Sequence, residues 1–307
     1  MDDFWQTSYI PTEKIDLSAF GIGGFSLFIK REDLLHPFVS GNKFRKLKYN
    51  IESAQLQSKD TLLTFGGAFS NHIAATAAAG KEFEMKTIGI IRGEELADKI
   101  GENPTLTFAQ NCGMQFHFVS RETYRQKETS WFLNDLKEKF GDFYLVPEGG
   151  TNSFAVKGCT EILDVQDKIY DYVCVPVGTG GTIAGLIEAS GENQNILGFS
   201  ALNGIFQSEG IKKYTSKRNY KLIDSYCFGG YGKIEKNLVR FINDFRSITG
   251  IPLDPVYTGK MLFGIMDLLK IGYFSENSRI LAVHTGGLQG VAGMNAVLKR
   301  KKLPLIE

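Results

Sequence analysis

The 307-residue sequence contains few cysteines and histidines, almost no net charge and no long hydrophobic run. Its 35 lysines and arginines balance 34 aspartates and glutamates, so no basic excess indicates a nucleic-acid or anionic-membrane partner. No apolar run approaches the roughly 18 residues of a membrane-spanning helix. The acidic start, Met1–Trp5, lacks the basic segment and apolar core of a secretory signal. These absences favour a protein that acts on small molecules, and we expect it in the cytoplasm.

The four cysteines and four histidines give no indication of a metal or dithiol site. No two cysteines have Cys-x-x-Cys spacing, so neither a zinc ribbon nor a redox dithiol is predicted. The histidines lack the i, i+4 spacing that places two metal ligands on one helix face. We therefore expect buried free thiols and no bound metal. The residues concerned are Cys112, Cys159, Cys174, Cys227, His36, His72, His117 and His284.

Short apolar runs alternate along the chain with longer segments of helical periodicity. With 43% hydrophobic residues, the chain is long enough for two domains or one large one, and no low-complexity linker or internal repeat divides it. The alternation is typical of βαβ units and predicts an α/β fold with mainly parallel sheets. The expected strands span residues 27–30, 61–65, 87–91, 115–119, 143–146, 172–177, 196–200 and 279–284, and the expected helices include 43–57, 71–81, 131–140, 155–168, 182–190 and 259–269.

A glycine-rich turn, Gly178–Thr182, follows the predicted strand 172–177 and opens a predicted helix. Such a turn presents backbone N–H groups and the positive end of the helix dipole to an anion, and its two threonines can add hydroxyl donors. It is not a Walker loop, because no Lys-Ser/Thr follows, and Ile183 occupies the last position of a Gly-x-Gly-x-x-Gly fingerprint. The turn predicts phosphate binding, with a turn that binds no ligand as the alternative.

Other small-residue segments place polar side chains where elements begin or end. Gly41 precedes Lys43 at the start of a helical run, although a solvated basic helix start is the simpler interpretation of one lysine. The pair Ser70 and Asn71 follows two glycines and opens an alanine-rich helix, where such a pair is more often a cap than a catalyst. A Gly-Gly-Tyr-Gly segment contains Tyr231, and buried tyrosines are usually core residues. Each segment alone therefore leaves its function open.

Together, these segments resemble the pyridoxal-phosphate enzymes of the tryptophan-synthase-β fold (fold type II). Within them, the chain is similar to the branch that contains 1-aminocyclopropane-1-carboxylate deaminase and D-cysteine desulfhydrase. The specific blocks are Gly-Asn-Lys-x-Arg-Lys-Leu at 41–47 and Asp-Pro-Val-Tyr-x-Gly-Lys at 254–260, and His-Thr-Gly-Gly at 284–287 adds to them. The similarity extends from about Ile10 to about Ala296.

The resemblance implies pyridoxal 5'-phosphate as cofactor and a homodimer of chains with two open three-layer α/β domains. A small domain, residues 46–145, would be inserted into a large cofactor-binding domain formed by residues 1–45 and 146–307. The cofactor would lie in the cleft between them, which suits an open α/β sheet because ligands gather beyond the carboxyl ends of its strands.

The resemblance also implies a role for each segment. Lys43 would be bonded covalently to the cofactor and move the substrate's Cα proton, and Lys46 would help to neutralise the phosphate. Asn71 would lie against the ring oxygen, while Ser70 and the His72 amide grip the substrate carboxylate. The implied catalytic residues are Lys43, Ser70, Tyr231 and Tyr257, and the implied cofactor-binding residues are Lys43, Lys46, Asn71, Gly178, Thr179, Gly180, Gly181, Thr182, Thr258 and Thr285.

One departure from the family pattern bears on the substrate. The deaminases that open a cyclopropane have Tyr-Glu-Gly-Lys where this chain has Tyr257-Thr258-Gly259-Lys260. A carboxylate would hold the pyridine nitrogen of the cofactor protonated, whereas a hydroxyl would not. Thr258 therefore favours β-elimination from a small amino acid such as D-cysteine, giving pyruvate, ammonia and sulfide, although Thr285 could face the nitrogen instead.

Other activities stay open at this point. They are 1-aminocyclopropane-1-carboxylate deamination, β-replacement like that of cysteine synthase, a racemase-like or weak general lyase activity, and non-catalytic binding of pyridoxal phosphate or another phosphorylated metabolite.

Overall fold

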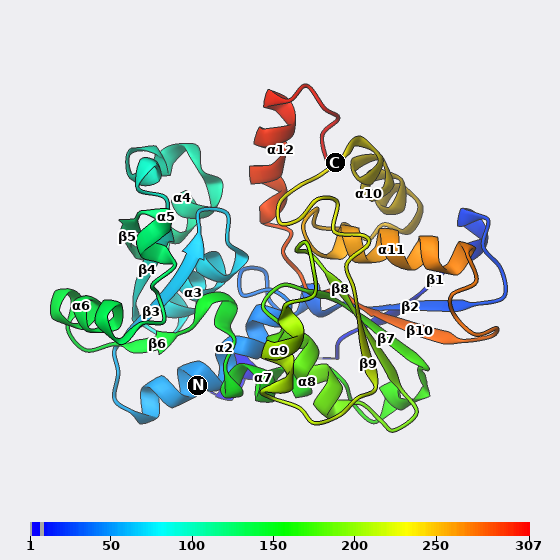
Figure 1. The fold of residues 1–307 in the computed structure, drawn as a ribbon, viewed down its shortest axis with the longest axis horizontal. Coiled ribbons are helices and arrows are strands. Elements are labelled where there is room, and N and C mark those ends of the chain that lie inside the picture. The colour runs from blue at the N-terminus through cyan, green and yellow to red at the C-terminus, as the bar shows by residue number, and fades with distance from the viewer. Residues whose placement is uncertain (1, 7–8) are drawn as a thin grey trace.

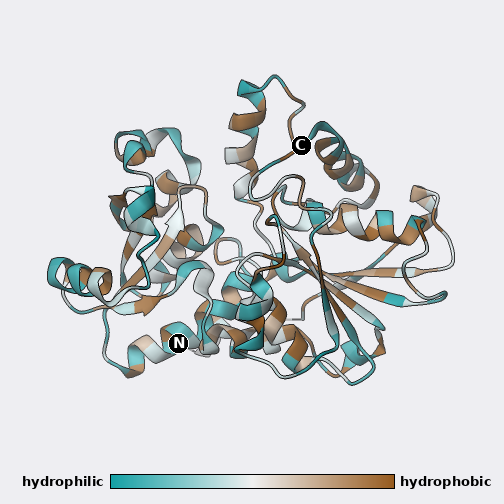
Figure 2. Cartoon of the chain, in the orientation of Figure 1, coloured by the Kyte–Doolittle hydropathy of each residue, from teal (hydrophilic) through white to brown (hydrophobic). Residues whose placement is uncertain are grey.

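The computed structural model describes residues 2–6 and 9–307, so Met1, where the acidic N-terminal segment begins, lies outside the described residues. The strands form two separate sheets joined by the helices between them (Figure 1). Brown, hydrophobic residues gather on the strands of both sheets, and teal residues colour much of the outer helices (Figure 2). The predicted α/β class with mainly parallel sheets is confirmed.

The larger sheet has six strands in the order β1-β2-β10-β7-β8-β9, and all neighbours are parallel except β1 and β2. On β7, Val173 and Val175 pack in a core shared with α8, while Cys174 faces the opposite core, shared with α11. A strand that is buried on both faces is apolar throughout, which explains the uninterrupted run at 172–177. The strands are β1 (Thr12–Ile15), β2 (Ser26–Lys30), β7 (Tyr172–Val177), β8 (Asn195–Ser200), β9 (Tyr220–Ile223) and β10 (Arg279–Val283).

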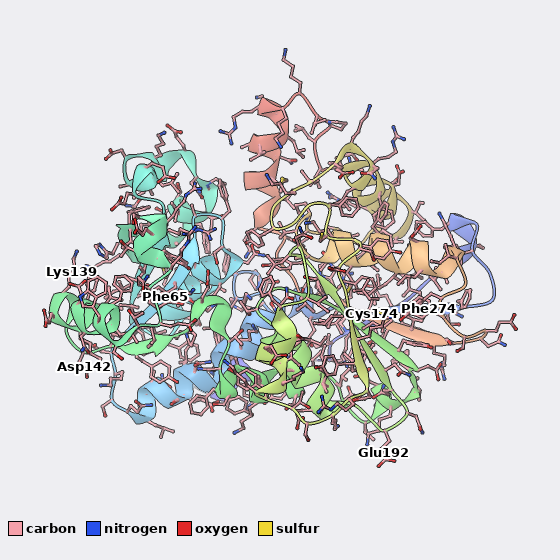
Figure 3. All side chains as sticks on the ribbon, in the orientation of Figure 1. Phe65, Lys139, Asp142, Cys174, Glu192 and Phe274 are labelled. Atoms are coloured by element: carbon pink, nitrogen blue, oxygen red, sulfur yellow. The ribbon has the colours of Figure 1, made fainter. Side chains whose placement is uncertain are left out.

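The smaller sheet has four parallel strands in the order β5-β4-β3-β6. Phe65 of β3 is buried with Phe132 of α6 in one of its cores, and Figure 3 shows Phe65 inside this unit while Lys139 and Asp142 lie at its outer edge. The strands are β3 (Thr61–Gly67), β4 (Lys86–Arg92), β5 (Gln115–Val119) and β6 (Tyr144–Val146).

Helix α2 (Asn42–Leu56) connects the two sheets. Its apolar face packs with Leu62 and Tyr144 of the smaller sheet. Its other side packs closely on α7 (Ser153–Thr160), because a Cβ atom at Gly158 would lie only 1.9 Å from the backbone oxygen of Arg45. Any side chain at Gly158 would therefore push α2, and the residues at its start, away from the larger sheet.

The remaining helices cover the two sheets. Helix α3 follows β3, α8 follows β7, and α12 contacts α4 of the smaller unit. The helices are α1 (Asp2–Trp5), α3 (Asn71–Glu82), α4 (Pro104–Asn111), α5 (Arg121–Tyr124), α6 (Ser130–Phe140), α8 (Gly181–Ala189), α9 (Gln207–Lys212), α10 (Lys236–Thr249), α11 (Thr258–Lys270) and α12 (Gly290–Arg300), with short 3-10 turns at Leu17–Phe20, Glu32–Leu34, Glu94–Glu102, Glu148–Gly150 and Gln166–Ile169.

The predicted helix 155–168 is wrong in its second half. Helix α7 ends at Thr160, and Asp164 accepts hydrogen bonds from the backbone N–H groups of Gln166 (2.7 Å) and Asp167 (3.3 Å) to begin a separate 3-10 turn. That turn brings the buried Asp167 carboxylate to Lys30, and a continuous helix would not make this ion pair. A buried tertiary contact thus overrides local helical periodicity.

The cysteines agree only partly with expectation. Cys159, Cys174 and Cys227 are free and buried, but Cys112 is half-buried. Among the helices of residues 2–6 and 9–307, none is long and apolar enough to cross a membrane.

Candidate active site

The candidate site lies beyond the carboxyl ends of β3, β7 and β10, where the loops after these strands meet the start of α2. Parallel strands bring such loops to one edge of a sheet, which is where ligands bind in open α/β folds. These loops and α2 line one cavity. The predicted site residues that line it are Lys43, Lys46, Asn71, Gly178, Thr179, Gly180, Thr182, Tyr257 and Thr285.

A close backbone contact places Lys43 at this cavity. Gly41 has φ of 60°, and a Cβ atom there would lie 2.0 Å from the backbone oxygen of Thr285. The N–H group of Asn42 donates to the same oxygen at 3.3 Å, so the first turn of α2 rests directly on the loop after β10. Desolvation and the neighbouring charge of Lys46 lower the pKa of Lys43 to about 7. The Lys43 amine is therefore neutral and nucleophilic in a large fraction of the molecules near pH 7.

The turn Gly178–Thr182 and Lys46 form an anion cradle. Gly180 has φ of 93° and immediately precedes α8, and no side chain among the described residues caps the first N–H groups of this helix. Lys46 donates to the Gly149 oxygen at 2.9 Å and to Thr151 Oγ1 at 3.0 Å, and its Nζ would lie 3.2 Å from a Cβ atom at Gly181. The free helix terminus and the adjacent ammonium group are what a phosphate needs, so these residues fit the phosphate of pyridoxal phosphate.

The segment Ser70–His72 presents donors at the start of α3. Ser70 Oγ accepts from the N–H groups of His72 (3.2 Å) and Ile73 (3.4 Å), which leaves its own O–H free to donate. The Asn71 side chain lies against the loop after β10, because a Cβ atom at Gly287 would be 2.6 Å from Asn71 Nδ2. Asn71 lines the cavity, whereas Ser70 serves as the helix cap beside it.

His72 is buried and neutral. Its Nε2 lies 2.8 Å from Thr64 Oγ1, whose O–H donates to the Val146 oxygen at 2.8 Å. Thr64 can therefore only accept from the ring, which assigns the ring proton to Nε2 and leaves Nδ1 as an acceptor without a partner among the described residues. Burial, with the charges of Lys43 and Lys46, holds the pKa of His72 well below its usual value.

The two predicted tyrosines lie face to edge. Their ring centres are 6.1 Å apart, and the Tyr257 hydroxyl would lie 3.3 Å from a Cβ atom at Gly178, directly over the phosphate turn. Tyr257 lines the cavity, while Tyr231 lies outside its lining and is 45% exposed. Desolvation raises the pKa of both hydroxyl groups, that of Tyr257 well above its usual value, so both stay protonated at neutral pH and can donate.

The two threonines expected near the ring nitrogen differ in position. Thr258 is fully buried outside the cavity lining, and its hydroxyl donates to Asp254 Oδ1 at 2.8 Å and accepts from the Asp254 N–H at 2.9 Å. Thr285, in contrast, lines the cavity. The hydroxyl of Thr258 therefore closes the turn before α11, whereas Thr285 is the threonine of this pair that lines the ligand space.

Sequence reasoning overlooked several residues that build the site. Asn42 Nδ2 donates to Thr182 Oγ1 at 2.8 Å, which joins α2 to the anion cradle, and Gly149 and Thr151 hold Lys46. Asp254 organises the turn before α11 with its carboxylate, and burial raises its pKa. The glycine pair Gly149-Gly150 after the predicted strand 143–146 repeats the pattern of the glycine pair before Ser70, and this signal could have located the segment.

A lysine amine of lowered pKa that shares a cavity with an anion cradle fits the site of an enzyme that uses pyridoxal phosphate. The chain belongs to the pyridoxal-phosphate dependent enzyme family, which it matches over residues 5–286. The predicted family and cofactor are thereby confirmed.

The names of two relatives state an activity within this family. The chain is 31% identical to the bifunctional D-cysteine desulfhydrase/1-aminocyclopropane-1-carboxylate deaminase, mitochondrial, of Arabidopsis thaliana, over 87% of this chain and 74% of that protein. It is 28% identical to a 1-aminocyclopropane-1-carboxylate deaminase of Rhizobium rhizogenes, over 92% and 93%.

A solved structure described as an ACC deaminase homologue superposes with a TM-score of 0.81 at 27% identity, over 95% of this chain and 94% of that one. The structure of threonine deaminase isoform 2 from Solanum lycopersicum shares the fold, with a TM-score of 0.67 at 17% identity over 96% and 89%. The Arabidopsis and Rhizobium relatives, with the family match, support lyase activity that depends on pyridoxal phosphate.

Proposed function

We propose that the protein catalyses β-elimination from a small D-amino acid, with D-cysteine as substrate and pyruvate, ammonia and hydrogen sulfide as products. The observation that carries this proposal is that no carboxylate lines the cavity within the described part of the chain. Of the two threonines expected near the ring nitrogen, Thr285 lines the cavity, whereas Thr258 is engaged by Asp254. A cavity without a carboxylate supports a weaker electron sink, which suits loss of a good leaving group better than opening of a cyclopropane.

Each proposed role follows from what a side chain can do in its position. Pyridoxal phosphate, when bound, supplies an electron-withdrawing ring that stabilises negative charge at Cα. The Lys43 amine is placed to hold the cofactor and then to accept the Cα proton. The Ser70 O–H is free to bind the substrate carboxylate, and the protonated hydroxyls of Tyr231 and Tyr257 can donate a proton to the departing sulfur. Water completes the reaction by releasing ammonia.

The proposed cofactor contacts rest on the same geometry. The turn Gly178–Thr182 and Lys46 would hold the phosphate, Asn71 would contact the ring oxygen, and Thr285 rather than Thr258 would face the ring nitrogen. Deamination of 1-aminocyclopropane-1-carboxylate is the second candidate, because the Arabidopsis and Rhizobium relatives carry that activity in their names.

A parallel assay of the purified holoprotein separates the two candidates. We expect pyruvate from D-cysteine and no 2-oxobutyrate from 1-aminocyclopropane-1-carboxylate. Production of 2-oxobutyrate would refute the argument from the missing carboxylate, and visible cofactor absorbance without turnover of any D- or L-amino acid would favour a non-catalytic binder.

Variants test the assigned residues. Lys43→Ala should abolish both the visible absorbance and turnover. Thr285→Val should shift the absorbance of the bound cofactor, whereas the matched Thr258→Val should leave the spectrum unchanged and reduce stability by about 1–3 kcal/mol, because it leaves buried partners at Asp254 without a hydrogen bond. The opposite pattern would assign the contact with the ring nitrogen to Thr258 instead of Thr285.

The domain division into 1–45 with 146–307 and an inserted 46–145 is also a proposal. Its support is that each sheet takes its strands from one of these segments, apart from Val146 at the end of β6. The homodimer and the cytoplasmic location are proposed from the family resemblance and the sequence, and light scattering of the purified protein tests the dimer.

A further inference from the structure

Arg92 is a cationic residue beside the proposed substrate loop that has no assigned role. It is the last residue of β4 and pairs in register with Gly67 of β3, at the carboxyl end of the smaller sheet. Its Nη2 would lie 3.6 Å from a Cβ atom at Gly67, so the guanidinium lies over this glycine. The Gly67 oxygen accepts the N–H group of Ser70 at 3.0 Å. Arg92 therefore contacts the turn that ends at the proposed carboxylate-binding serine.

The guanidinium of Arg92 has no anionic partner among the described residues. Over residues 2–6 and 9–307 it makes no hydrogen bond and no ion pair, and its Cζ lies 5.6 Å from the ring centre of Tyr124. The Glu148 carboxylate, which contacts the same tyrosine, is already engaged by the Tyr124 hydroxyl at 2.7 Å and by Lys127 at 3.4 Å. Arg92 therefore forms no ion pair with a carboxylate of the described residues, and its guanidinium remains able to bind an anion.

The charge of Arg92 also acts on a residue of the larger unit. The positive charge of Arg92 acts on the hydroxyl of Tyr231, lowering its pKa against the larger upward effect of desolvation. Arg92 belongs to the smaller sheet, whereas Tyr231 lies in the loop between β9 and α10. Arg92 thus lies beside the Ser70 turn of the smaller unit and close enough to Tyr231 of the larger unit for its charge to act on that hydroxyl.

The substrate brings a charge that the other site residues do not neutralise. Ser70 is a neutral donor that also caps α3, Lys46 is held at the anion cradle, and Lys43 is committed to the cofactor in the proposed function. An amino-acid carboxylate bound only by neutral donors keeps its full negative charge, and an arginine fork is well matched to a carboxylate.

We propose that Arg92 is a substrate-specificity residue that supplies the positive charge opposite the α-carboxylate of the amino acid. This inference rests on the proposed function, since it assumes an amino-acid substrate at the Ser70 turn. It predicts that the protein binds free amino acids more tightly than their amides, and that this preference is lost when Arg92 is replaced by a neutral residue.

A binding experiment on the holoprotein tests this without requiring turnover. Glycine and glycinamide are titrated against the change in cofactor absorbance, because both lack a leaving group and a stereocentre and differ in the carboxylate. We expect the wild type to bind glycine more tightly than glycinamide. Arg92→Gln should weaken glycine binding about fivefold, which is the size of effect expected for an exposed charge contact, and should leave glycinamide binding unchanged. Raising the salt concentration should weaken glycine binding to the wild type and not to the variant.

Arg121→Gln provides the matched control, because Arg121 lies on the surface of the same unit in an exposed pair with Glu95 and the substitution changes the net charge equally. It should leave both titrations unchanged. Arg92→Lys should recover part of the preference for glycine. In turnover, Arg92→Gln should raise KM about fivefold with kcat within about twofold, because an exposed contact to a non-reacting group acts mainly on binding.

Three results would overturn the proposal. The first is a wild type that does not bind glycine more tightly than glycinamide, and the second is an equal loss of glycine and glycinamide binding in Arg92→Gln. The third is a loss in Arg92→Gln of binding of racemic aspartate only, which would assign Arg92 to a side-chain carboxylate instead. Failure of the proposed function is distinguishable, because it shows as an absence of keto acid from the wild type, whereas the titrations still decide the role of Arg92.

Discussion

The lowered pKa of Lys43 leads to a quantitative prediction about how the apoprotein captures an aldehyde. An ordinary lysine, with a pKa of 10.5, is neutral in about one molecule in 3,000 at pH 7, whereas a pKa of about 7 makes about half of the amines neutral. Only the neutral amine attacks a carbonyl carbon. Lys43 should therefore react about a thousandfold faster at pH 7 than an exposed lysine of equal intrinsic reactivity, and its rate should reach a plateau above about pH 8.

The assay measures covalent attachment of pyridoxal, which lacks the phosphate and so does not depend on the anion cradle. The adduct is trapped by borohydride and quantified by mass spectrometry between pH 5 and pH 10. The rate at Lys43 should rise with a midpoint near pH 7. A midpoint near pH 10 would refute the argument that desolvation and a neighbouring ammonium group tune this amine.

A variant separates the two causes. Lys46→Met removes the neighbouring positive charge, so the protonated form of Lys43 becomes less unfavourable, its pKa rises and the midpoint should move to higher pH. Lys48→Met is the matched control, because Lys48 lies on the same helix but pairs with Glu161. It should leave the midpoint in place, and an equal shift in both variants would indicate a change of helix position instead of a charge effect.

Two further predictions concern how α2 is held in place. Gly41→Ala should destabilise the protein by about 2–4 kcal/mol and abolish cofactor absorbance, because Gly41 has a positive φ and a Cβ atom there would lie 2.0 Å from the Thr285 oxygen. Gly101→Ala is the control, because its Cβ would meet nothing within 4 Å. Equal urea-unfolding midpoints for the two variants would contradict this prediction. Arg45→Met should lower the free energy of unfolding by about 3–5 kcal/mol, because it leaves the fully buried Glu32 without its counter-charge. Adding Glu32→Leu should recover at least half of that loss. A double variant as unstable as the single one would show that the pair contributes more than charge compensation.

Local patterns predicted most of the strands that carry the site. The run at 172–177 was located to the residue because β7 is covered on both faces, and any polar residue there would be buried without a partner. The glycine-rich turn after β7 was predictable for a related reason, since a positive φ at Gly180 and the approach of a ligand both exclude side chains.

Other features could not be predicted because they depend on partners far away in the sequence. The helix predicted through residue 168 ends at Thr160, where Asp167 turns back to meet Lys30, 137 residues before it. The two candidate threonines look equivalent in sequence, and only the hydrogen bonds of Thr258 to Asp254 distinguish them. Arg92 ends an ordinary strand, and its relation to Ser70 appears only when β3 and β4 are paired in register.

The sequence by itself determined the class of fold, the family and the kinds of chemical groups available, because periodicity, glycine turns and short motifs are properties of neighbouring residues. The tertiary structure decided which of these groups share one cavity, that the pKa of Lys43 falls to about 7, and which of the two threonines lines the cavity. Those properties arise from desolvation and from contacts between the ends of β3, β7 and β10 and the start of α2, and no local pattern in the chain encodes them.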